Sequence, residues 1–112
     1  MLKFEEKIFN LLDKIEKLSY LVNNKLKESS IDVDEINFLY EDRNQILRKL
    51  TDMKDENDWK SFLIENNSKF FKKIDDIKII ENENIEILNK FTTETGKNLQ
   101  NLNKNKNLLV YR

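Results

Sequence analysis

The chain has 112 residues, of which 38 % are hydrophobic and 37 % charged, and its 20 basic and 21 acidic side chains leave a net charge of −1. This composition suffices for one packed domain but supplies no overall field that would attract nucleic acid or an anionic membrane. With no His and no Cys, the chain lacks common zinc ligands, a thiol nucleophile and a base that titrates near neutral pH, so we expect a protein that is not an enzyme and has no cofactor and no metal. A single Gly and no Pro argue against hairpins and phosphate-binding loops and favour an all-α fold.

The strongest helical pattern lies at the N-terminus, where we predict a helix over about 2–28. Its hydrophobic residues recur at steps of three and four, as in a helix packed along one seam. The stripe consists of Phe4, Ile8, Leu11, Ile15, Leu18, Val22 and Leu26. A helix of this length, about 40 Å, is buried only against other long helices, and we expect Ile8, Leu11, Ile15 and Leu18 in the core.

The same N-terminal segment bears on location. It begins MLKFEEKIFN, with acidic residues where a signal peptide would be basic. No hydrophobic stretch approaches the roughly 20 residues that span a bilayer. We therefore expect a cytoplasmic protein without membrane insertion.

A second helix is predicted over about 32–53. Asp32 is its expected N-cap, with Glu35 three residues later as in a capping box. Leu39, Ile46 and Leu50 are its expected core residues. Arg43 falls on the same hydrophobic seam, which indicates either a charge paired across the bundle or a polar anchor for a partner.

A third helix is predicted over about 58–95, with a seam that shifts between Glu81 and Asn84. Gly96 is the expected break before a shorter C-terminal helix over about 97–109. The acidic cluster between the second and third helices could suggest calcium, but it lacks the spacing and glycine of an EF-hand, so helix capping and solvation are the better interpretation. The predicted fold is thus an antiparallel bundle of three long helices plus a C-terminal helix.

The bundle contains more large aromatic side chains than one straight core can hold, since Phe9, Phe38, Phe62 and Phe71 lie away from the main seams. Either the bundle hides them, or some line a groove for an amphipathic segment of another protein. For such a groove the third helix offers Phe71, Ile74, Ile77, Ile85 and Leu88. The C-terminal segment offers Leu99, Leu102 and Tyr111 as an internal cover.

These features resemble a known family. The run EDRNQILRKL at 41–50 is similar to the acidic–Arg–x–x–Leu–Leu–x–x–Leu pattern of flagellar type III export chaperones of the FliT kind, and the segment 87–111, ending at Tyr111, resembles their closing helix. Val110 stands where family members usually have Ala. Chaperones of the FlgN kind share the architecture. The resemblance implies a cytoplasmic chaperone that binds the disordered C-terminal region of a filament-cap protein and delivers it to the export ATPase, with a closing helix that moves aside.

Two other functions fit the same pattern. A structural coiled-coil protein would self-associate through the first helix, so the chain could be a monomer or a homodimer. A small nucleic-acid-binding regulator would use the basic segment 97–112, although the single aromatic there, Tyr111, offers little for base stacking.

Overall fold

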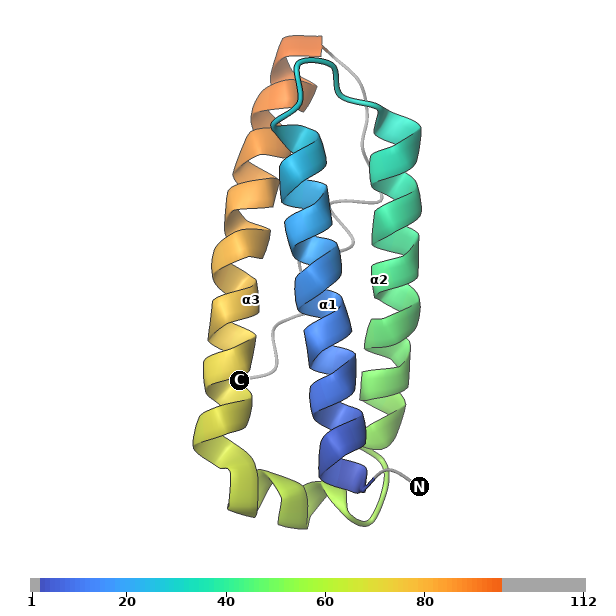
Figure 1. Cartoon of the computed structure of the whole chain (residues 1–112), viewed down its shortest axis with the longest axis vertical. Helices are drawn as coiled ribbons and strands as arrows, with labels where there is room; N and C mark the ends of the chain where they lie inside the picture. The colour runs from blue at the N-terminus through green and yellow to red at the C-terminus, as the bar shows by residue number, and fades with distance from the viewer. Residues whose placement is uncertain (1–2, 96–112) are drawn as a thin grey trace.

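The computed structural model describes residues 3–95, which form three antiparallel helices in an up-down-up arrangement (Figure 1). They are α1 (Phe4–Leu26), α2 (Val33–Met53) and α3 (Trp59–Thr95), and this part of the chain contains no strand. The predicted three-helix bundle is confirmed, and its helices end within a few residues of the predicted bounds. The predicted helix over 97–109 lies outside the described residues, as do Gly96, Leu99, Leu102 and Tyr111.

Helix α1 is the central helix and packs against both α2 and α3, whose backbones stay farther from each other (Figure 1). Contact with two neighbours changes the buried stripe at two positions of the predicted seam, where Leu12 and Ser19 replace Leu11 and Leu18, because the centre of the stripe must face the line between α2 and α3. Ile8 and Ile15 are buried as predicted, whereas Leu11 and Leu18 are only half-buried at its edge. The buried stripe of α1 consists of Ile8, Leu12, Ile15, Ser19, Val22, Asn23 and Leu26.

The same correction applies to α2. Leu50 is buried as predicted, but Leu39 and Ile46 are half-buried, and their neighbours Tyr40 and Leu47 are the core residues. Leu39 and Ile46 occupy the edge of α2 that also carries Glu35, which pairs with Lys25 of α1 at 3.1 Å. The spacing of the hydrophobic residues therefore predicted which side of each helix is buried, but it did not predict which residues lie at the centre of that side.

The start of α2 confirms the predicted cap. The Asp32 carboxylate accepts hydrogen bonds from the backbone N–H groups of Asp34 and Glu35 at 3.1 and 3.2 Å. These two donors have no partner within the helix, so the side chain satisfies them where the chain turns back from α1.

Removal of this cap gives a first prediction. Asp32→Ala is expected to lower the free energy of unfolding by about 1 kcal/mol, measured by urea denaturation followed by circular dichroism. Asp32→Asn keeps an accepting oxygen and should stay close to the wild type. Equal losses in the two variants would contradict a capping role.

Helix α3 bends near its start, which the sequence pattern did not predict. Asn66 leaves helical geometry at φ −123° and ψ 20°, and its side-chain amide donates to the carbonyl of Phe62 at 3.2 Å. The first two turns therefore lie across the end of the bundle (Figure 1). This bend brings Phe62 against α1, where it makes edge contacts with the rings of Phe4 and Phe9, and the ring of Trp59 lies beside Phe62.

The core is divided into two hydrophobic clusters. The basal cluster, at the end closed by the bend of α3, consists of Ile8, Leu12, Ile15, Leu47, Leu50, Phe62, Phe70, Ile74 and Ile77. The distal cluster, near the α1–α2 connection, consists of Val22, Leu26, Ile36, Tyr40 and Leu88. Between them lies a polar layer formed by Ser19, Asn23, Arg43, Glu81 and Asn84, all of them buried.

Candidate functional site

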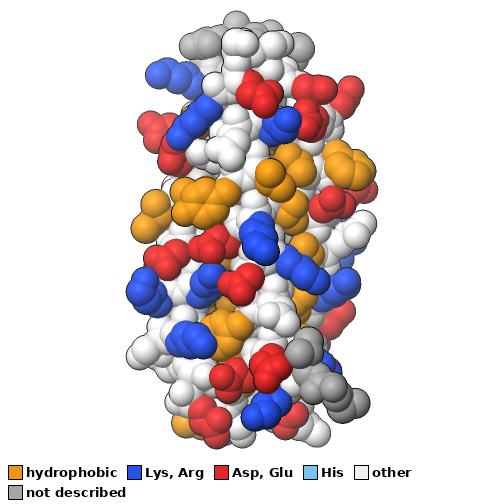
Figure 2. Space-filling model, in the orientation of Figure 1, with side chains coloured by type: hydrophobic (Ala, Val, Ile, Leu, Met, Phe, Trp, Pro, Cys, Tyr) orange, Lys and Arg blue, Asp and Glu red, His pale blue; other side chains and the backbone are white. Residues whose placement is uncertain are grey.

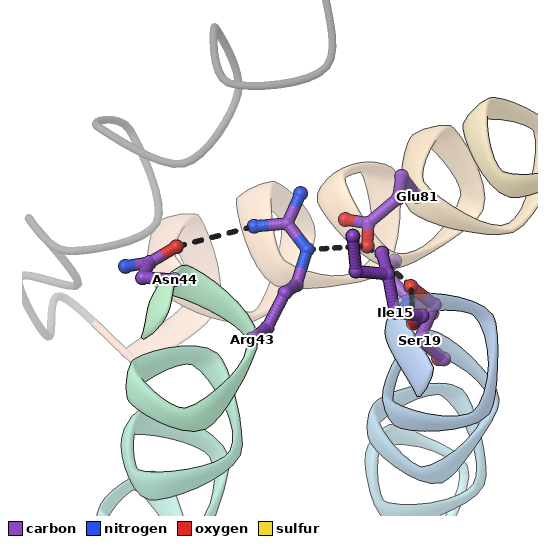
Figure 3. A network of polar contacts seen from close by, with 6 residues as sticks. Ile15, Ser19, Arg43, Asn44 and Glu81 are labelled. Atoms are coloured by element: carbon purple, nitrogen blue, oxygen red, sulfur yellow. Dashed lines mark hydrogen bonds and ion pairs between the residues drawn. The ribbon is translucent and has the colours of Figure 1, made fainter. Parts of the chain in front are cut away.

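The polar layer is centred on an ion pair between α2 and α3. The Arg43 Nε donates to Glu81 Oε1 at 2.7 Å, and the two residues are only 1 % and 4 % exposed. Figure 3 shows Arg43 and Ser19 converging on Glu81 from different helices. The Ser19 hydroxyl has one proton, which it can donate to this carboxylate or to the Ile15 carbonyl at 2.9 Å.

A pair of asparagines completes the layer. Asn23 Nδ2 donates to Asn84 Oδ1 at 2.9 Å, and Asn84 Nδ2 donates to the backbone carbonyl of Ser19 at the same distance. Each of these hydrogen bonds between helices therefore ends on Glu81 or Asn84 of α3. The layer fixes the height of α3 against the other two helices, because a shift of α3 by one turn would leave these buried groups unpaired.

Sequence reasoning located this site only in part. Arg43 was recognised as a polar residue on a hydrophobic seam, and the structure shows it as a charge paired across the bundle. Its side chain is enclosed and bonded to Glu81, so a role as a polar anchor for a partner stays a prediction that requires α3 to move. The shift of the α3 seam between Glu81 and Asn84 was the available signal for its partners, whereas Ser19 and Asn23 gave none.

Tyr40 lies next to the layer and is buried without a partner for its hydroxyl among the described residues. The Arg43 guanidinium stands 5.5 Å from the centre of its ring. Burial raises the pKa of the Tyr40 hydroxyl above its usual value, the negative charge of Glu81 raises it further, and Arg43 opposes both. The hydroxyl therefore stays protonated in the folded protein at any ordinary pH.

A second prediction concerns this hydroxyl. Tyr40→Phe is expected to raise the free energy of unfolding by about 1 kcal/mol at neutral pH, because a buried polar group without a partner is destabilising. The raised pKa also predicts that the wild type loses stability above pH about 10, where the unfolded chain releases the tyrosine proton and the folded chain retains it.

The measurement is urea denaturation of the wild type and Tyr40→Phe at pH 7, 9 and 11. The difference in the free energy of unfolding between Tyr40→Phe and the wild type should grow between pH 9 and 11. A constant difference would show that Tyr40 titrates alike in the folded and unfolded chains. Tyr20→Phe is the control, since Tyr20 is 48 % exposed.

The five residues predicted to bind a partner fall into two groups. Ile74 and Ile77 belong to the basal cluster and Leu88 to the distal cluster, so all three are covered in this conformation. Phe71 and Ile85 are half-buried. They lie on the flank of α3 opposite Lys73 and Glu83, which pair with α1, so this flank turns toward α2.

Helix α3 is held unevenly along its length. It contributes Phe62, Phe70, Ile74 and Ile77 to the basal cluster but only Leu88 to the distal cluster. At about 1.5–3 kcal/mol for each fully buried side chain, the basal part is anchored several times more strongly. The half-buried Ile87 and Phe91 add to the distal part.

The surface carries several exposed hydrophobic side chains between its charges (Figure 2). They are Tyr20, Leu21, Phe38, Ile64 and Ile79. Of the four aromatics expected away from the seams, Phe38 is exposed, Phe9 and Phe71 are half-buried, and Phe62 is buried. The bundle therefore hides only part of this set, and a groove for a segment of another protein stays a prediction.

A shallow hollow lies between α1 and α3 beside Phe9, and its charges are largely paired. Lys73 reaches Asp13 at 2.7 Å and Glu16 at 2.8 Å, and Lys69 stands 4.4 Å above the Phe9 ring. Although partial burial disfavours the charged ammonium, these carboxylates raise the pKa of Lys73. The hollow thus lies where two helices of the protein contact each other, and the charges that line it are used in that contact.

No protein family, curated protein or solved structure gives a significant match to this chain. The resemblance to flagellar export chaperones therefore stays a prediction. Within residues 3–95, no group of three or more acidic side chains is arranged to hold a metal ion. No helix in that range combines the length and the hydrophobicity needed to cross a membrane.

Proposed function

We propose that the protein is a cytoplasmic binding protein of the flagellar export chaperone kind, which holds an amphipathic segment of a client protein and delivers it for export. The observation that carries the proposal is the arrangement of α2 and α3. Their backbones stay apart, Arg43 and Glu81 bridge them, and the flank of α3 between them presents half-buried Phe71 and Ile85. A client helix with a hydrophobic face would bury such a flank.

The resemblance of the run at 41–50 supports the same class, and it assigns the client to a filament-cap protein and the delivery to the export ATPase. A client that is disordered when free loses conformational entropy on binding. The resulting moderate affinity suits a chaperone that must release its cargo.

The test is calorimetric binding of the C-terminal region of the filament-cap protein from the same genome. Ile85→Glu is expected to weaken binding at least tenfold, because it places a charge on the contacting flank. Phe38→Glu changes an exposed side chain on α2 and should bind like the wild type. No binding by the wild type, or equal loss in both variants, would contradict the proposal.

The proposed cover formed by Leu99, Leu102 and Tyr111 has its own test. Removing residues 97–112 should strengthen client binding if this segment competes with the client. Unchanged or weaker binding would count against a covering role.

Self-association is the second candidate, and the exposed hydrophobic side chains favour it (Figure 2). Light scattering at increasing concentration separates the two functions. A stable dimer that does not bind the export client would favour the structural coiled-coil protein.

A further inference from the structure

The part of α3 beyond the polar layer, residues 81–95, is here called the distal arm. Its buried contacts comprise one hydrophobic side chain, Leu88, and two polar ones, Glu81 and Asn84. A surface ion pair, Lys27 with Glu83 at 2.9 Å, joins it to the end of α1. The half-buried Ile87 and Phe91 also pack against the distal cluster, so the arm is attached through one buried and two half-buried hydrophobic side chains together with these polar contacts.

The surface beneath the arm belongs to the α1–α2 hairpin. Val22 and Leu26 come from α1, and Ile36 and Tyr40 come from α2. The hairpin has contacts of its own, including the ion pair of Lys25 with Glu35 at 3.1 Å. It does not need the arm to bring its two helices together, since residues of α1 and α2 meet in both the basal and the distal cluster.

Displacement of the arm would have unequal consequences for its groups. The released Glu81 and Asn84 side chains regain hydrogen bonds with water, so the polar layer gives the closed state specificity more than stability. The hairpin, in contrast, would expose a hydrophobic surface with Arg43 at its edge. Because an exposed hydrophobic surface is unfavourable in water, an open hairpin that binds another helix is more stable than an open hairpin whose surface stays empty.

We propose that the distal arm occupies a binding groove on the α1–α2 hairpin and is exchanged there for a helix of a partner protein. The arm itself defines the chemistry of that partner. The helix must supply a carboxylate for Arg43, an amide three residues later for Asn23 and the Ser19 carbonyl, and a large aliphatic side chain four residues after that, as Glu81, Asn84 and Leu88 do. The exchange of the arm does not rest on the proposed function, because the client proposed there contacts Ile85 while the arm is in place.

The experiment uses the full chain and a fluorescent peptide with the sequence of residues 77–95 as the probe. Leu88→Ala weakens the chain's own arm and leaves the groove intact, so it raises the fraction of open groove. The apparent affinity for the probe should rise about tenfold, since apparent affinity follows that fraction. The matched control is Ile79→Ala, which changes an exposed side chain of α3 and should leave probe binding unchanged.

Two further variants keep the test independent of the stability of Leu88→Ala. A probe with alanine at the positions of Glu81 and Asn84 should lose binding at least tenfold. The double variant Lys27→Cys with Glu83→Cys replaces the surface ion pair in a chain that has no other cysteine; joined by a reducible thiol cross-linker, it holds the arm closed and should bind the probe only after reduction. Equal binding before and after reduction, or no gain in Leu88→Ala, would overturn the exchange of the arm.

The outcomes separate this inference from the proposed function. If the probe binds as expected but the filament-cap client does not, the groove stands and the export assignment fails. If the client binds the cross-linked double variant more weakly than the wild type, the client itself replaces the arm, and the site on the α3 flank given under the proposed function fails. A wild-type dimer that the probe dissociates would overturn the assignment to a foreign helix, because the occupant would then be the arm of a second copy.

Discussion

Glu81→Ala is expected to lower the free energy of unfolding by about 3–5 kcal/mol, which is the typical cost of leaving a buried charge without its partner. The Arg43 guanidinium is 1 % exposed and donates to Glu81 at 2.7 Å. Its hydrogen bond to Asn44, at 3.5 Å, is long and does not replace a carboxylate. A loss of this size is a large fraction of the total stability of a small domain.

The double variant Arg43→Met with Glu81→Met separates the cost of an unpaired charge from the value of the pair. Removing both charges and filling the space with hydrophobic side chains should be neutral or stabilising. Lys72→Ala is the surface control, since its ion pair with Asp76 is exposed and worth at most about 1 kcal/mol. All variants are measured by urea denaturation followed by circular dichroism.

A double variant as unstable as Glu81→Ala would contradict this account, because the ion pair itself would then stabilise the fold. The polar layer would then not serve mainly to fix the height of α3 against the other two helices, which is its register role. A double variant that is stable but partly dimeric would support the register role, because a uniform hydrophobic seam permits more than one pairing.

The class of fold could be predicted because it depends on local information. Residue spacing gave the three helices, and Asp32 gave the start of the second one, since an N-cap acts within one turn. The centre of each stripe could not be predicted in this way. It depends on where the neighbouring helices lie, which decided between Leu11 and Leu12 and between Leu39 and Tyr40.

Only one of the two residues of the buried ion pair could be predicted from the sequence. Arg43 was conspicuous because a charge interrupted a hydrophobic seam. Its partner Glu81 is separated from it by 38 residues in sequence, and several other carboxylates were equally plausible before the helices were placed. The bend at Asn66 was hidden for a related reason, since the run of Asn66, Asn67 and Ser68 lowers helix propensity but does not show a change in direction.

The two clusters explain why the partner residues predicted on α3 differ in accessibility. Ile74 and Ile77 are part of the core that holds the bundle together, and no client can reach them without unfolding it. Leu88 lies beyond the polar layer, where fewer contacts must break. A binding site on this bundle is therefore expected at its distal part, while the basal part remains the stable scaffold.

Phe70→Ala tests that scaffold directly and is expected to cost about 3–5 kcal/mol. Phe70 is 1 % exposed, and its ring makes edge contacts with Trp59, Phe62 and Phe71 at centroid distances of 5.6, 5.6 and 5.2 Å. Each aromatic pair adds about 0.5–1.5 kcal/mol beyond the buried area. The substitution therefore removes both the burial and three ring contacts.

Trp59 is the only tryptophan of the chain and lies against Phe70, so its fluorescence during urea denaturation reports on the basal cluster. Phe38→Ala is the control, because Phe38 is 63 % exposed and its loss should change stability by less than about 0.5 kcal/mol. If the basal cluster is the scaffold, Phe70→Ala should lower the urea midpoint seen by Trp59 and by circular dichroism equally. A loss below about 1 kcal/mol, or a Trp59 transition well before the loss of helix, would mean that the distal part keeps the bundle folded and would reverse the roles of the two clusters.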